Sequence, residues 1–186
     1  MSKEYAVLTA IGADRVGIVD DISGELVSRG CNIEGSRMAV LGGEFAVIML
    51  ATGDSSAFDA IAAELPLLDA RLSLRLAVRR TRPPAHAEAG RPYVIEAVSL
   101  DTPGIVHAVT SVLRGLAVNI EGLDTDTSAA PWTGAPMFRM RALVVLPAGV
   151  PVALLRGELA RLEADHDLDI TLKPALAPAA GESGRP

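Results

Sequence analysis

Cysteine, aromatic residues and long apolar runs are all scarce in this chain. Cys31 is the one cysteine, which excludes an internal disulfide framework. Aromatic residues make up 3% of the chain and hydrophobic residues 49%, so the core must be aliphatic. No apolar run approaches the roughly 18 residues of a membrane span, and the start MSKEYAVL lacks the features of a secretory signal. We therefore expect a cytoplasmic protein without a membrane partner.

An excess of basic charge is missing too, since the formal net charge is −6. Direct binding of nucleic acid usually requires a basic patch that replaces counterions on phosphate. The nearest feature is Arg79, Arg80 and Arg82, close to Arg75, which we interpret as a solvated strand end and linker. No helix-turn-helix or zinc-finger pattern is recognisable. We expect no direct contact with nucleic acid.

Residues with catalytic or metal-binding spacing are also missing. The three histidines, His86, His107 and His166, show no metal-ligand spacing with one another or with Cys31. No phosphate-binding glycine loop or nucleophile elbow occurs. We therefore expect no catalytic residue, no metal and no cofactor, and we expect Cys31 to behave as a small buried apolar residue.

The chain does contain a long internal repeat. Residues 7–37 align without a gap with residues 94–124, at an offset of 87 residues. The identical residues include the Gly-Ile-Val at 17–19 and 104–106 and the Asn-Ile-Glu-Gly at 32–35 and 119–122. A period this long indicates a duplicated domain rather than a solenoid unit.

The first copy has a clear order of strands and helices. A short apolar run predicts a strand at 4–11, and apolar spacing from Ile18 predicts a helix. The following segments predict a strand at 32–41, a turn at Gly42-Gly43, a strand at 44–51, a helix at 55–68 and a strand in which Leu72, Leu74, Leu76 and Val78 alternate with polar residues. The order β-α-β-β-α-β is typical of the ferredoxin-like arrangement.

The second copy repeats this order. It predicts strands at 92–99, 118–127, 137–146 and 168–172, and helices at 104–116 and 151–164. Its one large difference is the segment Ser128–Pro136 in place of the two-glycine turn. Trp132 in this segment covers a ligand or partner surface, or else simply anchors the loop.

These patterns predict an α+β fold of two ferredoxin-like βαββαβ domains in tandem. Each domain has an antiparallel sheet with both helices on one face. We place the domains at residues 1–80 and 92–173. The segment 81–91, which contains Pro83-Pro84, is the expected linker, and the Ala-, Gly- and Pro-rich tail from 174 to 186 is expected to be disordered.

Two repeated motifs are candidate ligand sites, and the first lies between the first strand and the first helix. It reads Asp14-Arg15-Val16-Gly17-Ile18 in one copy and Asp101-Thr102-Pro103-Gly104-Ile105 in the other. The Asp is expected to cap the helix. The Gly allows close approach to backbone N–H groups, which would hold a carboxylate. A capped, tight turn without a ligand is the alternative interpretation.

The second motif, Asn32-Ile33-Glu34-Gly35, recurs as Asn119-Ile120-Glu121-Gly122 and opens the second strand. An Asn amide donates to a carboxylate and accepts from an amine, which suits a zwitterion. The alternative is that Asn and Gly only shape the turn. The two motifs lie at opposite ends of one helix, so joint use would favour a site at a domain interface.

The two turns, the amphipathic helix, the NIE strand start and the apolar hairpin together resemble the ACT domain. The resemblance covers residues 4–79 and 92–173, and the tandem layout is similar to the glycine cleavage system transcriptional repressor group. It implies a regulator that binds an amino acid and acts through a protein partner such as a transcription regulator. A homodimer is expected separately, because small βαββαβ modules commonly associate through sheet edges or faces. By position it implies ligand contacts from residues 14–18 and 101–105, with Asn32, Ile33, Asn119 and Ile120 as further contacts.

Some residues depart from the family pattern. Val16 stands where proline is common, and Leu123-Asp124 replace the Ser36-Arg37 of the first copy. The departure at Val16 and the insertion at 128–136 leave open an adaptor that keeps the fold but binds no ligand. A detached regulatory piece of an enzyme such as formyltetrahydrofolate deformylase is a third interpretation.

Overall fold

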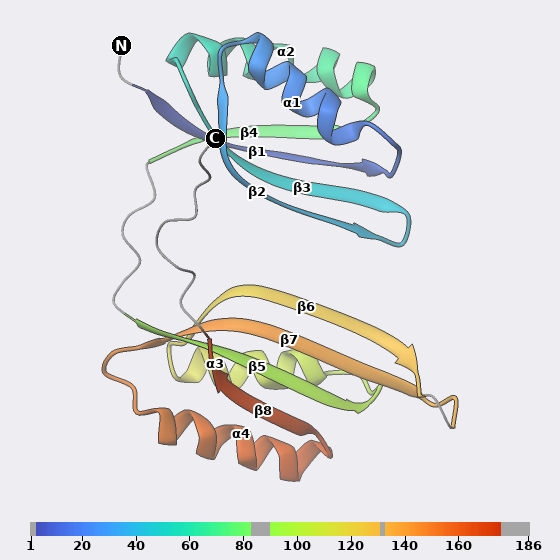
Figure 1. The fold of residues 1–186 in the computed structure, drawn as a ribbon, viewed down its shortest axis with the longest axis vertical. Coiled ribbons are helices and arrows are strands. Elements are labelled where there is room, and N and C mark those ends of the chain that lie inside the picture. Colours follow the sequence, from blue (N-terminus) through green and yellow to red (C-terminus); the bar gives the residue numbers. More distant parts are fainter. Residues whose placement is uncertain (1–2, 83–89, 131–132, 176–186) are drawn as a thin grey trace, which may run out of the picture. The chain divides into compact units, whose positions relative to one another are not determined.

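The computed structural model describes residues 3–82, 90–130 and 133–175. The chain divides into two compact units, residues 1–86 and 87–186. Both units have the element order strand, helix, strand, strand, helix, strand (Figure 1).

The first unit is a four-stranded antiparallel sheet with two helices. Its elements are β1 (Glu4–Ala13), α1 (Ile18–Ser28), β2 (Asn32–Leu41), β3 (Glu44–Gly53), α2 (Ser55–Leu72) and β4 (Arg75–Thr81). The strand order is β2-β3-β1-β4. Central β1 pairs with β3 from Glu4 opposite Gly53 to Ala13 opposite Glu44. Figure 1 shows α1 and α2 over the same face of this sheet.

The alternation of side chains along β1 decides which face is covered. Successive residues of a strand point to opposite faces. Alternate residues of β1 and one stripe of α1 form the buried core: Ala6, Leu8, Ala10, Ile18, Ile22 and Leu26. The intervening Thr9 and Ile11 are exposed, so the face opposite the helices is open.

The β2–β3 hairpin confirms the turn expected at Gly42-Gly43. Both glycines have positive φ, 61° and 84°. A two-residue turn with φ positive at both positions matches the twist of the flanking strands and is disfavoured for residues with a Cβ. The turn therefore fixes the register in which Leu41 lies opposite Glu44.

The second unit repeats this architecture with the same strand order, β6-β7-β5-β8. Its elements are β5 (Gly90–Leu100), α3 (Ile105–Gly115), β6 (Asn119–Ala129), β7 (Pro136–Pro147), α4 (Val152–His166) and β8 (Asp169–Pro174). The predicted fold class, two ferredoxin-like βαββαβ modules with helices on one face, is confirmed. Within the described residues, no helix is long and apolar enough to cross a membrane.

The β6–β7 hairpin is longer than the sequence suggested. Pairing continues to Ala129 opposite Pro136, so both ends of the predicted insertion 128–136 belong to strands. Ala130 N–H donates to the Ala135 carbonyl at 2.8 Å, which closes the loop. Pro131 and Trp132 lie outside the described residues.

The end of α2 corrects one prediction. The helix continues through Pro66 to Leu72, whereas Leu72 was expected to start the last strand. Leu68 and Leu72 are both buried, so the helical stripe continues to that point. Ser73 ends the helix with φ 56°, and β4 begins at Arg75.

The structure also bears on the expected linker and tail. Strands β4 and β5 reach Thr81 and Gly90, so they extend into the range expected for the linker. Ala175 N–H donates to the Pro92 carbonyl at 3.0 Å. The rest of the expected linker, 83–89, and of the expected tail, 176–186, lies outside the described residues.

Candidate ligand-binding site

The turn between β1 and α1 is built around a glycine in the left-handed region. Gly17 precedes the first helical residue with φ 91°, and Gly104 does the same for α3 with φ 100°. A Cβ added at either position would meet no atom within 4 Å. Backbone conformation, rather than lack of space, therefore requires glycine here.

The expected capping by Asp14 and Asp101 is wrong. The N-cap residues are Gly17 and Gly104, and neither helix has a side-chain hydrogen bond at its cap. The Asp14 N–H instead donates to the Gly43 carbonyl at 2.9 Å, and Asp101 N–H donates to the Pro136 carbonyl at 2.9 Å. Each Asp thus fastens its turn to the neighbouring hairpin through the backbone.

The uncapped helix starts leave N–H groups for an anion. The first bond within α1 runs from Asp21 N–H to the Gly17 carbonyl, and in α3 from Ala108 N–H to the Gly104 carbonyl, both 2.9 Å. The N–H groups before these positions have no partner within an α-helix. They lie at the positive end of the helix dipole, where a carboxylate is stabilised.

Ile18 and Ile105 can offer only their backbone to a ligand at this turn. Their side chains are 2% and 4% exposed and belong to the two cores. The Val16 side chain, in contrast, is 99% exposed. The turn therefore offers main-chain donors beside an exposed apolar side chain.

Arg15 is already engaged within the protein. Its Nη2 donates to Asp21 Oδ2 at 2.6 Å and to the Leu72 carbonyl at 3.3 Å. This ties the turn to α1 and to the end of α2. Thr102 takes this position in the second unit, so Arg15 contacts have no counterpart there.

The starts of α1 and α3 differ in their acidic residues. Comparing the two repeated motifs alone did not reveal this difference. The first turn of α1 contains Asp20 and Asp21, while that of α3 contains no acidic residue. At the offset of 87, His107 and Ala108 take the aspartate positions. Asp21 is paired with Arg15, but Asp20 opposes a second anion, which favours the start of α3 at Pro103-Gly104 as the candidate carboxylate site.

The Asn-Ile-Glu-Gly motif encodes a β-bulge in both units. Ile33 lies opposite Ala51 and Gly35 opposite Leu50, so Glu34 has no partner of its own. The same shift occurs between Ile120 and Gly122. Sequence reasoning missed this irregularity, and the Glu-Gly pair repeated at one strand position was its available signal.

Glu34 is held by its neighbours at the bulge. Its Oε1 accepts a hydrogen bond from Thr52 Oγ1 at 2.7 Å and from Asn32 Nδ2 at 3.2 Å. These two bonds, that from Thr52 first, lower the pKa of Glu34. One amide hydrogen of Asn32 is thus used within the motif.

Within one unit the two motifs are not brought together. Ala13, before the first motif, lies opposite Glu44, whereas Asn32 lies opposite Thr52. These registers place the motifs at opposite ends of the sheet, separated by the length of α1. Ile33 and Ile120 pack against the cores. Of the ligand contacts expected from this motif, only Asn32 and Asn119 have exposed side chains.

Asn119 lies beside a hollow at the end of α3. A cavity of about 420 Å³ is lined by Thr110, Arg114 and Asn119, among others. An amide and a guanidinium side by side can both donate to a carboxylate. This hollow is separate from the Gly104 turn.

Metal binding finds no support in the part of the chain that is described. No group of three or more His, Cys, Asp or Glu residues could hold a metal there. Cys31 is buried, as expected, and burial raises the pKa of its thiol.

Two βαββαβ modules, each with a left-handed glycine at the start of its first helix, define a regulatory protein of the ACT-domain class. A family model described as the ACT domain matches residues 4–79. The glycine cleavage system transcriptional repressors of Escherichia coli (strain K12) and Shigella flexneri are each 36% identical over 156 residues, covering 82% of this chain and 80% of theirs. The chain therefore belongs to the ACT-domain family of glycine cleavage system transcriptional repressors.

A solved structure agrees over nearly the whole chain. An unknown protein from Galdieria sulphuraria is 33% identical with a TM-score of 0.79. The match covers 94% of this chain and 100% of that one. The tandem arrangement of two modules is thus shared with that protein.

Proposed function

We propose that this chain is a non-enzymatic regulator that binds an amino acid and passes the signal to a protein partner. The observation that carries the proposal is the left-handed glycine, present in both units, that opens the first helix turn to an anion. The relatives are named as repressors of the glycine cleavage system, which supports a role in amino-acid metabolism. Glycine is therefore the first ligand to test.

The second unit is the main ligand site in this proposal. The N–H groups of Ile105 and the next residues hold the carboxylate, and Gly104 lets it approach. At the start of α1, Asp20 weakens the same interaction, while Asp21 is paired with Arg15. Asn32 or Asn119 contributes only to a turn of a different unit, because within its own unit each lies far from the turn.

Calorimetric titration of the full chain tests this function. The protein is unfolded, freed of carried-over ligand and refolded, and it is then titrated with glycine and the other common amino acids. We expect Gly104→Ala to abolish the heat of binding and the matched Gly17→Ala to leave most of it. Both variants carry the same backbone strain, so circular dichroism confirms that each is folded. No heat with any amino acid would contradict the proposal.

An adaptor function is favoured by one feature of the first unit. Its turn combines the fully exposed Val16 with acidic residues at the helix start. This surface suits an apolar protein contact better than a carboxylate. Recovery of the same stable partner with and without added amino acids, and loss of that partner in Val16→Asp, would support it.

A further inference from the structure

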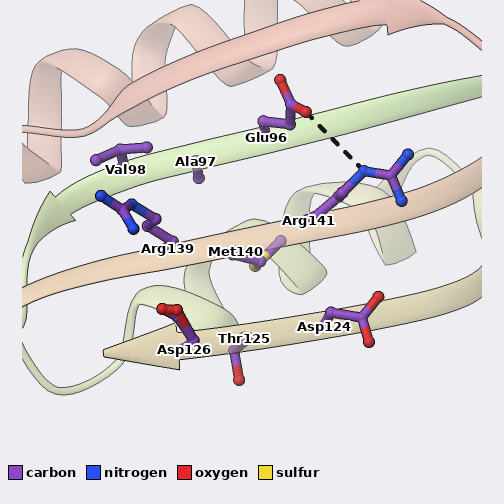
Figure 2. Close-up of a pocket in the computed structure, with 9 residues that line it drawn as sticks. All are labelled: Glu96, Ala97, Val98, Asp124, Thr125, Asp126, Arg139, Met140 and Arg141. Atoms are coloured by element: carbon purple, nitrogen blue, oxygen red, sulfur yellow. Dashed lines mark ion pairs between the residues drawn. The ribbon is translucent and has the colours of Figure 1, made fainter. Parts of the chain in front are cut away.

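The open face of the second sheet contains a groove that is separate from both helix starts. The groove has a volume of about 360 Å³. The residues lining it come from β5, β6 and β7: Glu96, Ala97, Val98, Asp124, Thr125, Asp126, Arg139, Met140 and Arg141 (Figure 2). Ala97 and Met140 are 0% and 2% exposed, so their side chains face the core and their backbone forms the floor.

Charged side chains stand in two columns along this groove. Asp124 lies opposite Arg141 and Asp126 lies opposite Arg139 in the β6–β7 ladder. Carboxylates therefore follow β6 and guanidinium groups follow β7, one strand spacing of about 4.8 Å apart. Figure 2 shows Asp126 and Arg139 at one end of the groove and Asp124 and Arg141 at the other.

Most of these charges are not used within the protein. Among the described residues, Asp124, Asp126 and Arg139 make no ion pair within 4.0 Å, although an opposite charge faces each across the ladder. Arg141 reaches only Glu96, with 3.9 Å between Nε and Oε1.

Glu96 differs from the two aspartates because its carboxylate already accepts hydrogen bonds within the protein. It accepts from Lys173 Nζ at 2.9 Å and from Thr171 Oγ1 at 3.3 Å. The bond from Lys173, with its charge, lowers the pKa of Glu96. A cationic group entering the groove therefore finds its free acceptors on β6 rather than on β5.

We propose that this groove binds a zwitterionic amino acid across the two strands, with its ammonium on Asp126 and its carboxylate on Arg139. A carboxylate fits the two-pronged guanidinium group, and an ammonium fits a carboxylate. Asp124 and Arg141 form the same arrangement two residues further along the β6–β7 ladder. For an amino acid larger than glycine, the side chain would lie over Val98, which is half-buried. Because the groove is open to water, which screens both ion pairs, we expect binding to be weak.

The first unit lacks these charges at the matching positions of its own sheet. Ala39 pairs with Ala46 where Asp126 pairs with Arg139, and Arg37 pairs with Ile48 where Asp124 pairs with Arg141. The open face of the first unit is thus an internal control that is expected not to respond.

Amide NMR spectra of the full chain, titrated with glycine up to about 20 mM, test the proposal. We expect shifts at Asp126 and Arg139 and none at Ala39 and Ala46. Asp126→Asn and Arg139→Gln should each weaken binding at the groove at least fivefold. Glycinamide, which lacks the carboxylate, and N-acetylglycine, which lacks the ammonium, should both fail to shift these residues.

The experiment can refute the groove and the ligand site at Gly104 independently of each other. Shifts confined to the region of Gly104 would overturn the groove and leave the proposed function standing. Groove shifts that N-acetylglycine reproduces would also overturn it, because a zwitterion would then not be required. Groove shifts without any response at Gly104 would support the groove and contradict the site at the helix start.

Discussion

The hydroxyl of Thr52 donates to Glu34 across the β2–β3 ladder, with 2.7 Å between the two oxygens. Thr52 is only 2% exposed, whereas its partner is on the surface. In the second unit, Val145 lies opposite Asn119 where Thr52 lies opposite Asn32. The bulge is therefore present in both units, but this bond to its glutamate is possible only in the first.

Replacing Thr52 by valine, the residue of the second unit, should raise the pKa of Glu34. The hydrogen bond stabilises the charged carboxylate, so its loss moves the pKa back toward the ordinary glutamate value. Because the folded pKa is lowered, this bond stabilises the fold above the ordinary pKa, and the effect is lost as the pH falls through the folded pKa. The carboxyl shift of Glu34 in an NMR titration measures the change. Thr9→Val, on the exposed face, should leave it unaltered.

Exchanging charge at the two helix starts should change ligand affinity in opposite directions. His107→Asp places an aspartate near the proposed carboxylate site, and Asp20→His removes one from the start of α1. A charge at a helix start contributes about 0.3–1 kcal/mol. We therefore expect His107→Asp to weaken binding about two- to fivefold in calorimetry at low salt. His166→Asp, at the far end of α4, should have no effect, and an equal loss in that control would contradict the model of the site.

Leu26→Ala should destabilise the first unit by about 2–5 kcal/mol, because Leu26 is packed in the core and the substitution leaves a cavity. The next residue, Val27, is 68% exposed and gives a matched control on the same helix. Val27→Ala should change the free energy of unfolding by no more than about 0.5 kcal/mol. Urea unfolding followed by circular dichroism measures both. Similar losses in the two variants would refute the assigned faces of α1.

Gly53 is required by its contact with the buried thiol. A Cβ at this position would lie 2.8 Å from Cys31 Sγ. Gly53→Ala should therefore cost about 1–3 kcal/mol of stability through overpacking. Combining it with Cys31→Ala should recover part of this loss, since the obstructing sulfur is gone. Additive losses in the double variant would show that the two residues do not interact.

We expect the purified chain not to bind DNA on its own. Its net charge is −6, and phosphate binding depends on basic patches. Gel-shift titrations at low and moderate salt, with the chain alone and with candidate regulator proteins, measure this. A sequence-specific shift by the chain alone, weakening with salt, would be incompatible with action through a partner.

Repetition and turn chemistry made much of the fold predictable from sequence. Gly42-Gly43 between two apolar runs indicated the hairpin, because a two-residue hairpin turn needs positive φ, which glycine adopts without strain. The stripe of Ile18, Ile22 and Leu26 indicated the buried side of α1. These features depend on residues close together in the chain.

The errors arose where distant residues decide the local structure. Leu72 fits both a helical stripe and an alternating strand, and packing beside Leu68 placed it in the helix. Asp14 has the chemistry of a cap, yet its turn is fixed by a backbone bond to Gly43 from another hairpin. The groove between β6 and β7 was not predicted because Asp126 and Arg139 become neighbours only through strand register.

The bulge shared by the two units also bears on the order in which their features arose. Ile33 and Ile120 precede an unpaired glutamate at the same place in both sheets. An extra residue of this kind, at the same place in both copies, is more simply inherited once than gained twice, which favours a bulge older than the duplication. The aspartates of α1 and the charged columns of β6 and β7 occur in one copy only. The two halves therefore diverged in surface charge while keeping a common backbone irregularity.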